Sequence, residues 1–149
     1  MMLLIQDKNP VEAAKLVPDR LKFKQLLELC QLICSCGYSN LYKTVNQGKE
    51  LQNWIKLNPS WTKIFAKELF IWCNERVNLQ SKTARTFKRI IDKIEDRNMS
   101  PIKTIIFRYK KEYKPLTRYS SGTEIPVIEG IKEYKKYAEW KERYSCCRK

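Results

Sequence analysis

The hydrophobic pattern is strongest over residues 18–36, where apolar side chains fill nearly every position outside one stripe. Four polar residues form that stripe, at spacings of three and four positions: Lys24, Glu28, Gln31 and Ser35. A helix places residues at these spacings on one face, and leucine, isoleucine, phenylalanine and cysteine cover the rest of it. We therefore predict a helix that ends at Gly37 and lies in the middle of a domain, surrounded by other helices.

Asparagine followed by proline marks the start of two more predicted helices, because asparagine caps a helix and proline fits its first turn. These pairs are Asn9-Pro10 and Asn58-Pro59. Apolar residues at helical spacing extend the second of these helices to about residue 78 and predict further helices at 49–57, 81–97 and 127–144. Residues expected to face inward on these helices include Leu16, Trp54, Trp61, Phe87, Ile128, Tyr134 and Tyr137.

The remaining stretches are less regular. Residues 3–6 suit either a short strand or an extended arm, residues 102–119 suit either a strand or a helix, and 37–48 and 120–126 are predicted loops. The predicted fold class is mainly α, a compact single-domain helical bundle around the central apolar helix. We place that domain at residues 1–144 and expect a short flexible tail at 145–149.

No run of apolar residues approaches eighteen, so no membrane-spanning helix is expected. The first ten residues lack the basic and apolar regions of a secretory signal. We therefore expect a cytoplasmic protein.

The net charge of the chain bears on its binding partner rather than on its fold. Thirty lysines and arginines against sixteen acidic residues give a net charge of +14 and a pI near 9.6. Residues 1–60 carry eight basic and five acidic side chains, whereas residues 61–149 carry twenty-two and eleven. A positive field of this size attracts polyanions, of which nucleic acid is the usual one. The alternative is a lysine-rich surface without a partner.

The chain has six cysteines and no histidine. Without histidine or paired Cys-x-x-Cys spacing, neither a zinc site nor a serine or cysteine triad is expected, and nothing in the sequence implies a cofactor. The cysteines on the central helix are predicted to be reduced, buried thiols. Acid–base chemistry would use Glu, Asp, Lys, Tyr, Cys or the N-terminal amine.

Basic and aromatic residues alternate over 102–119, and further basic residues cover the outer face of the predicted helix 81–97. Cations neutralise phosphates and aromatic rings accept unstacked bases, so this composition fits nucleic-acid binding. The alternative is an amphipathic segment whose rings pack inside while its lysines face water. The candidate contacts are Arg20, Arg85, Lys88, Arg89, Lys103, Arg108, Tyr109, Lys110, Lys111, Lys114 and Arg118.

Lys24 and Glu28 lie one turn apart on the central helix, and two interpretations are open. An exposed pair at this spacing is a structural ion pair worth about 0.2–0.5 kcal/mol. If the pair lies in an apolar cleft, the carboxylate can act as an acid or base and the amine as a nucleophile. Asp19 suits the start of the helix, where Arg20 can point at a phosphate.

Four stretches, in this order, resemble small phage and viral proteins described as pyrimidine-dimer DNA glycosylase-like, or endonuclease-V-like. They are QDKNPVEAAK, PDRLKFKQLLELCQLICS, KELQNWIKLNPSW and VIEGIKEYKKYAEWKER. In that family the central helix typically carries Cys-Asp-Lys-His-x-x-Lys-Met-x-x-Glu. Asp19, Lys24 and Glu28 match this pattern, Arg20 replaces a lysine, and Leu21 stands at the histidine.

Two other elements of the family bear on the resemblance. A typical His-Pro before a tryptophan falls on Lys49 and Glu50 before Trp54, so the tryptophan is kept and the histidine is not. The family's C-terminal element, rich in tyrosine and containing Trp-Lys, matches at Tyr134, Tyr137, Trp140 and Lys141.

The resemblance implies a compact helical DNA-binding fold and a combined glycosylase/AP lyase acting on damaged or modified pyrimidines. In such enzymes an amine attacks the sugar C1′ and forms a Schiff base, a carboxylate on a core helix assists, and a base is flipped out of the duplex. Here Glu28 matches the carboxylate, and the amine is Lys24 or the N-terminal amine. Asp19 is the third candidate catalytic residue, no metal or cofactor is implied, and the setting is the host cytoplasm.

Two other functions remain open: a viral DNA-binding protein without catalysis, and a protein whose basic face docks on an acidic host protein. The enzyme hypothesis predicts that Glu28 lies in a cleft lined by basic residues from 85–118. The non-catalytic hypothesis predicts that Glu28 is paired and covered.

Overall fold

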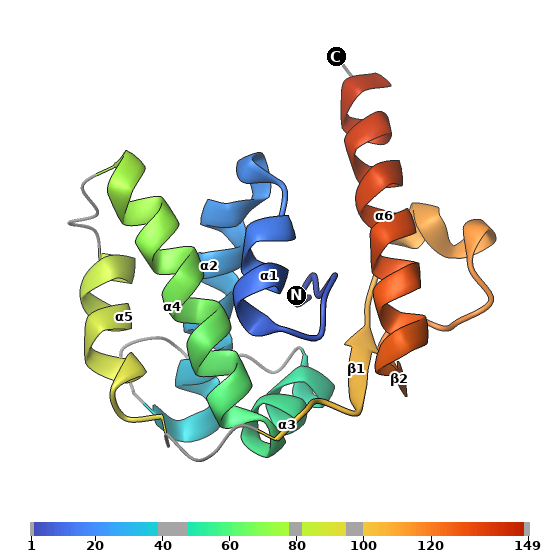
Figure 1. Cartoon of the computed structure of the whole chain (residues 1–149). Helices are drawn as coiled ribbons and strands as arrows, with labels where there is room; N and C mark the ends of the chain where they lie inside the picture. Colours follow the sequence, from blue (N-terminus) through green and yellow to red (C-terminus); the bar gives the residue numbers. More distant parts are fainter. Residues whose placement is uncertain (1, 39–47, 78–81, 95–99, 148–149) are drawn as a thin grey trace.

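The computed structural model describes residues 2–38, 48–77, 82–94 and 100–147 (Figure 1). These residues form six α-helices, two short helical turns and one antiparallel pair of strands. In chain order the elements are α1 (Pro10–Leu16), α2 (Asp19–Ile33), a π-helical turn (Cys34–Tyr38), α3 (Lys49–Leu57), α4 (Pro59–Arg76), α5 (Lys82–Ile91), β1 (Thr104–Phe107), a 3₁₀ helix (Lys111–Leu116), β2 (Thr123–Pro126) and α6 (Val127–Cys147). The prediction of a mainly helical fold is confirmed.

Both asparagine–proline pairs start helices as predicted. The Asn9 side chain accepts hydrogen bonds from the backbone N–H groups of Val11 at 2.9 Å and Glu12 at 3.3 Å, which caps α1. Pro59 occupies the first turn of α4, but the Asn58 side chain makes no cap bond there. Its amide instead donates to the Trp54 carbonyl at 2.9 Å, which fixes the turn between α3 and α4.

The helix α2 lies among α3, α4 and α5 and is the centre of the helical part, as its apolar sequence predicted. Its polar pattern differs from the prediction, however. Phe23 and Leu27 are 40% and 38% exposed, while Lys22 and Gln25 are buried. Lys22 donates to the Lys15 carbonyl of α1 and Gln25 donates to the Met2 carbonyl, which explains why both polar side chains are tolerated inside.

The N-terminal residues form the extended arm that the sequence allowed, and they pair with neither of the two described strands. Leu3, Leu4 and Ile5 are each at most 2% exposed. Gln25 on α2 accepts from the Leu4 N–H at 3.0 Å and donates to the Met2 carbonyl at 2.8 Å. The arm therefore lies beside α2, on the side that faces β1 and α6 (Figure 1).

The stretch 102–119 contains both structures that its sequence left open, a strand and a short helix. Strand β1 pairs with β2 in antiparallel register, with Ile105 opposite Ile125, so part of the predicted loop 120–126 is a strand. The indole N–H of Trp54 donates to the Thr104 carbonyl at 2.8 Å and joins α3 to the sheet. Helix α6 packs on β1 and β2 rather than joining the other helices in one bundle (Figure 1).

Several predicted boundaries and faces are wrong. Leu16 and Ile128 are 44% and 57% exposed, because each lies at an end of its helix where the core no longer covers it. Helix α5 ends at Ile91 in a turn. Residues 81 and 95–97 of the predicted helix lie outside the described residues, as do 39–47 of the predicted loop. Helix α6 continues to Cys147, into the predicted tail.

Gly130 provides a direct test of the contact between α6 and β1. A Cβ atom there would overlap Cδ1 and Cγ1 of Ile105, whose side chain is fully buried. We expect Gly130→Ala to lower the free energy of unfolding by about 1–3 kcal/mol, because overpacking outweighs the better helix propensity of alanine. Urea denaturation measures this, and combining it with Ile105→Ala should give less than the sum of the two single effects. Additive effects would contradict the close contact.

Candidate functional site

A hollow of about 160 Å³ opens where α2, the residues after β1 and α6 meet. Helix α2 contributes Lys24 and Glu28 to its lining, and α6 contributes Tyr137 and Lys141. The rest of the lining comes from residues 108–110 after β1 and from Met2 of the arm. A smaller hollow of about 30 Å³ shares Lys24, Glu28 and Lys141 with it and adds Leu21 of α2. The lining thus combines one carboxylate with several cations.

The helical spacing of α2 explains how Lys24 and Glu28 both reach the hollow. They lie one turn apart, with Lys24 exposed and Glu28 half-buried. Among the described residues, Glu28 makes no hydrogen bond and no ion pair within 4 Å, so the structural Lys24–Glu28 ion pair, one of the two interpretations, does not form. Its carboxylate is left to face the hollow.

Two buried tyrosines of α6 hold the segment that follows β1. The Tyr134 hydroxyl donates to the Ile106 carbonyl at 2.6 Å and accepts from the Arg108 N–H at 3.0 Å. The Tyr137 hydroxyl accepts from the Lys110 N–H at 3.1 Å. Burial raises the pKa of both hydroxyls, so they stay neutral donors and acceptors at physiological pH. These bonds place Arg108 and Lys110 beside the hollow.

Lys141 is a site residue that the catalytic and nucleic-acid-contact predictions missed. Its side chain is 7% exposed and lines both hollows. The guanidinium of Arg20 donates to its backbone carbonyl at 3.3 Å, which joins the start of α2 to α6. Burial, followed by the positive charges of Lys24 and Lys110, lowers the pKa of Lys141 to about 8. The spacing in the sequence could have indicated this position, because Lys141 follows the buried Tyr134 and Tyr137 on the same face of a helix.

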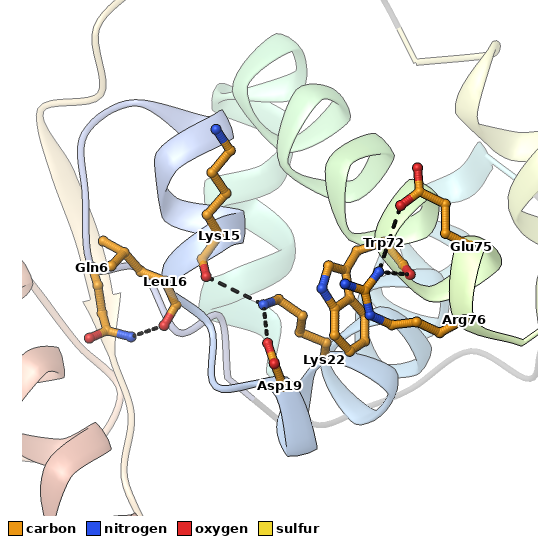
Figure 2. A network of polar contacts seen from close by, with 8 residues as sticks. All are labelled: Gln6, Lys15, Leu16, Asp19, Lys22, Trp72, Glu75 and Arg76. Carbon is orange, nitrogen blue, oxygen red and sulfur yellow. Dashed lines mark hydrogen bonds and ion pairs between the residues drawn. The ribbon is translucent and has the colours of Figure 1, made fainter.

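Asp19 lies in a different network, shown in Figure 2. Its carboxylate pairs with the buried Lys22 ammonium at 2.7 Å, and Lys22 also donates to the Lys15 carbonyl at 3.3 Å. The Trp72 ring lies between two cations, with Lys22 4.7 Å and Arg76 3.8 Å from its centroid. The hydrogen bond and charge of Lys22 lower the pKa of Asp19. Asp19 thus balances a buried cation rather than lining the hollow with Glu28.

The predicted nucleic-acid contacts fall into several groups. Arg108, Tyr109 and Lys110 line the hollow, and Arg20 reaches its edge through Lys141. Lys103, Lys111 and Lys114 are exposed on the C-terminal part, and Arg118 lies 3.8 Å from Glu129 in a separate cluster. Helix α5 lies on the far side of α4 from α6 (Figure 1), and Arg85, Lys88 and Arg89 are exposed on it. Only some of the predicted nucleic-acid contacts therefore lie at the hollow.

Thiol and metal chemistry have little basis in the residues that the structure describes. Burial raises the pKa of Cys30 to about 12 and of Cys36 and Cys73 to about 11, so these thiols are poor nucleophiles at neutral pH. Within the described ranges, no three cysteine or acidic side chains gather closely enough to hold a metal ion. The amines and the single carboxylate of the hollow are its reactive groups.

Comparisons with protein-family models, curated proteins and solved structures found no match to this chain. In the described parts of the chain, no helix has the length and apolar character needed to cross a membrane.

Proposed function

We propose that the protein binds DNA and acts on it as a glycosylase/AP lyase, with the hollow between α2 and α6 as its active site. One observation carries the proposal: the Glu28 carboxylate, unpaired among the described residues, shares a hollow with the amines of Lys24 and Lys141. The enzyme hypothesis predicts a cleft beside Glu28 lined by basic residues from 85–118, and Arg108 and Lys110 of that range line the hollow. The family resemblance of the central helix points to the same chemistry, with damaged or modified pyrimidines as substrates.

Charge supports DNA as the polyanion. The net charge is +14, and Lys24, Arg108 and Lys110 bring positive groups to the hollow itself. The Tyr134 hydroxyl holds the Arg108 backbone in place, and the Arg108 guanidinium lies 3.9 Å from the exposed Glu50 carboxylate. A backbone phosphate would be bound by these cations, and the sugar of a flipped nucleotide would enter the hollow.

The chemistry follows from an amine beside a carboxylate. The amine nitrogen attacks C1′ of the sugar, and the bond from C1′ to the base breaks, or the ring-opened aldehyde of an abasic site takes the amine directly. The first route then gives an imine by opening of the C1′–O4′ bond of the sugar ring, whose oxygen takes a proton, and the second route gives it by loss of water. The carboxylate moves these protons. Removal of a proton from C2′ of the imine eliminates the 3′ phosphate and cleaves the strand.

Borohydride trapping on a defined duplex tests this function. An oligonucleotide duplex with one abasic site, or one pyrimidine dimer, is incubated with the protein and sodium borohydride, and an undamaged duplex serves as the control. We expect a covalent adduct with the damaged duplex alone, and binding that weakens steeply as salt rises. If no adduct forms with either lesion, the lyase function is wrong.

A second candidate is a DNA-binding protein without catalysis. Leu21 favours it, because this apolar residue lines the smaller hollow where the resembling family has a histidine. Salt-sensitive binding without a trapped adduct would support this candidate. If DNA binding is undetectable even at low salt, both candidates fail, and an acidic protein surface becomes the partner to test.

A further inference from the structure

We propose that Lys141 is the amine of this site, and that it forms the covalent imine with the aldehyde of an abasic sugar. The inference rests on the proposed function and adds the identity of the nucleophile. The sequence left Lys24 and the N-terminal amine as the candidates, and the structure adds a third that is better placed than Lys24.

The first argument is that the Lys141 side chain is largely buried while its amine is open to the hollow. The residue is 7% exposed and lines both hollows beside Glu28. Within the described residues the Lys141 amine has no hydrogen bond or ion pair. Every fully buried side-chain nitrogen or oxygen in that part of the chain has a hydrogen-bond partner, so the Lys141 nitrogen is not one of the fully buried atoms. The amine of Lys141 is therefore not sealed off, and the hollow is where a ligand meets it.

The second argument is the difference from the other buried lysines. Lys22 donates to the Asp19 carboxylate at 2.7 Å and Lys63 donates to the Ile94 carbonyl at 3.3 Å, so both amines are held by protein oxygens. Lys141 has no such acceptor in the described chain, and Lys24 is exposed to water. A desolvated amine without an acceptor is the kind that becomes a nucleophile.

The third argument is the charge around the amine. On α2 it is faced by Lys24, Arg20 and Glu28, and the segment after β1 brings Lys110 and Arg108 to the same hollow. Burial and the nearby lysines keep about half of the Lys141 side chains neutral near pH 8, whereas an ordinary lysine with a pKa of about 10.4 is neutral in fewer than about one molecule in a hundred. Only the neutral amine has the lone pair that attacks carbon.

The step balances without any further reactant. The nitrogen lone pair forms a bond to C1′ of the aldehyde, and one proton passes from that nitrogen to the carbonyl oxygen to give a carbinolamine. The Glu28 carboxylate takes the remaining proton from the nitrogen and gives it to the departing hydroxyl, water leaves, and the carbon–nitrogen double bond forms. In the trapping experiment, borohydride delivers hydride to C1′ and converts the imine into a stable secondary amine.

The experiment locates the adduct and then removes the amine. The full-length wild type is trapped on an abasic duplex, digested with a protease and analysed by mass spectrometry, and the modified peptide is expected to contain Lys141. Lys141→Arg is expected to trap at least about 100-fold more slowly, since arginine keeps the charge but not the nucleophile. Lys136→Arg, on an exposed part of α6 outside the hollow, is the matched control and should trap at the wild-type rate.

The outcomes separate this inference from the function on which it rests. If the wild type forms no adduct at all, the proposed function falls together with the assignment. If the wild type is trapped but the adduct lies on Lys24 or on the N-terminal amine, only the assignment of Lys141 is wrong. The same holds if Lys141→Arg, checked for folding by circular dichroism, traps as fast as the wild type. A wild-type trapping rate that rises through about pH 8 would support the assignment, and a rate that is flat there would contradict it.

Discussion

Replacing Trp61 with alanine is expected to lower the free energy of unfolding by about 3–5 kcal/mol. Its side chain is 1% exposed and is stacked on Phe65, with ring centroids 5.2 Å apart, while Trp54 meets its edge at 5.5 Å. The indole N–H donates to the Lys8 carbonyl at 2.7 Å. Truncation would remove all of these contacts and leave a cavity under α1 and α4. Urea denaturation followed by circular dichroism measures the loss.

Two control variants separate packing from the hydrogen bond. Trp61→Phe keeps an apolar ring and loses the N–H donor, so we expect a smaller loss than in the alanine variant. Leu57→Ala lies at a position 80% exposed and should change stability by less than about 0.5 kcal/mol. If Trp61→Ala proved as mild as Leu57→Ala, the placement of Trp61 in the core would be wrong.

The sequence predicted most helices because the signals that start and shape them are local. Asn9 caps α1 with its own side chain, and the spacing of Leu51, Trp54 and Ile55 buries one face of α3 as expected. The residues that α2 buries could not be predicted in the same way. Gln25 is buried because the backbone of the N-terminal arm bonds to it, and that partner lies more than twenty residues away in the chain.

The candidate site shows the same limit. Glu28 and Lys24 could be found because they share a stripe on one helix and match a family pattern. Lys141 reaches them from the last helix, and only the packing of α6 on the sheet brings it there. Asp19 matches the family pattern equally well, yet it pairs with Lys22, which no sequence argument had placed inside. A motif shows which residues lie on a helix, whereas a site depends on what packs against that helix.

Glu28→Gln is expected to slow adduct formation on an abasic duplex by about 10²–10⁴-fold, the range found when a positioned acid–base group is removed. Glutamine keeps the size of the side chain but transfers no proton to the departing hydroxyl. Glu28 has no ion pair or hydrogen bond in the described chain, so the free energy of unfolding should change by less than about 0.5 kcal/mol. Single-turnover trapping kinetics give the rate. Glu139→Gln, an exposed change on α6, should leave it unaltered.

This variant also distinguishes proton transfer from tuning of the amine. The negative charge of Glu28 raises the pKa of Lys141, so its removal lowers that pKa further and leaves more of the amine neutral at pH 7. If the carboxylate acted only through this charge, Glu28→Gln would trap faster than the wild type and bind DNA more tightly, since one negative charge is gone. Slower trapping with equal or tighter binding would therefore support proton transfer by Glu28, and faster trapping would show that Glu28 takes no part in proton transfer.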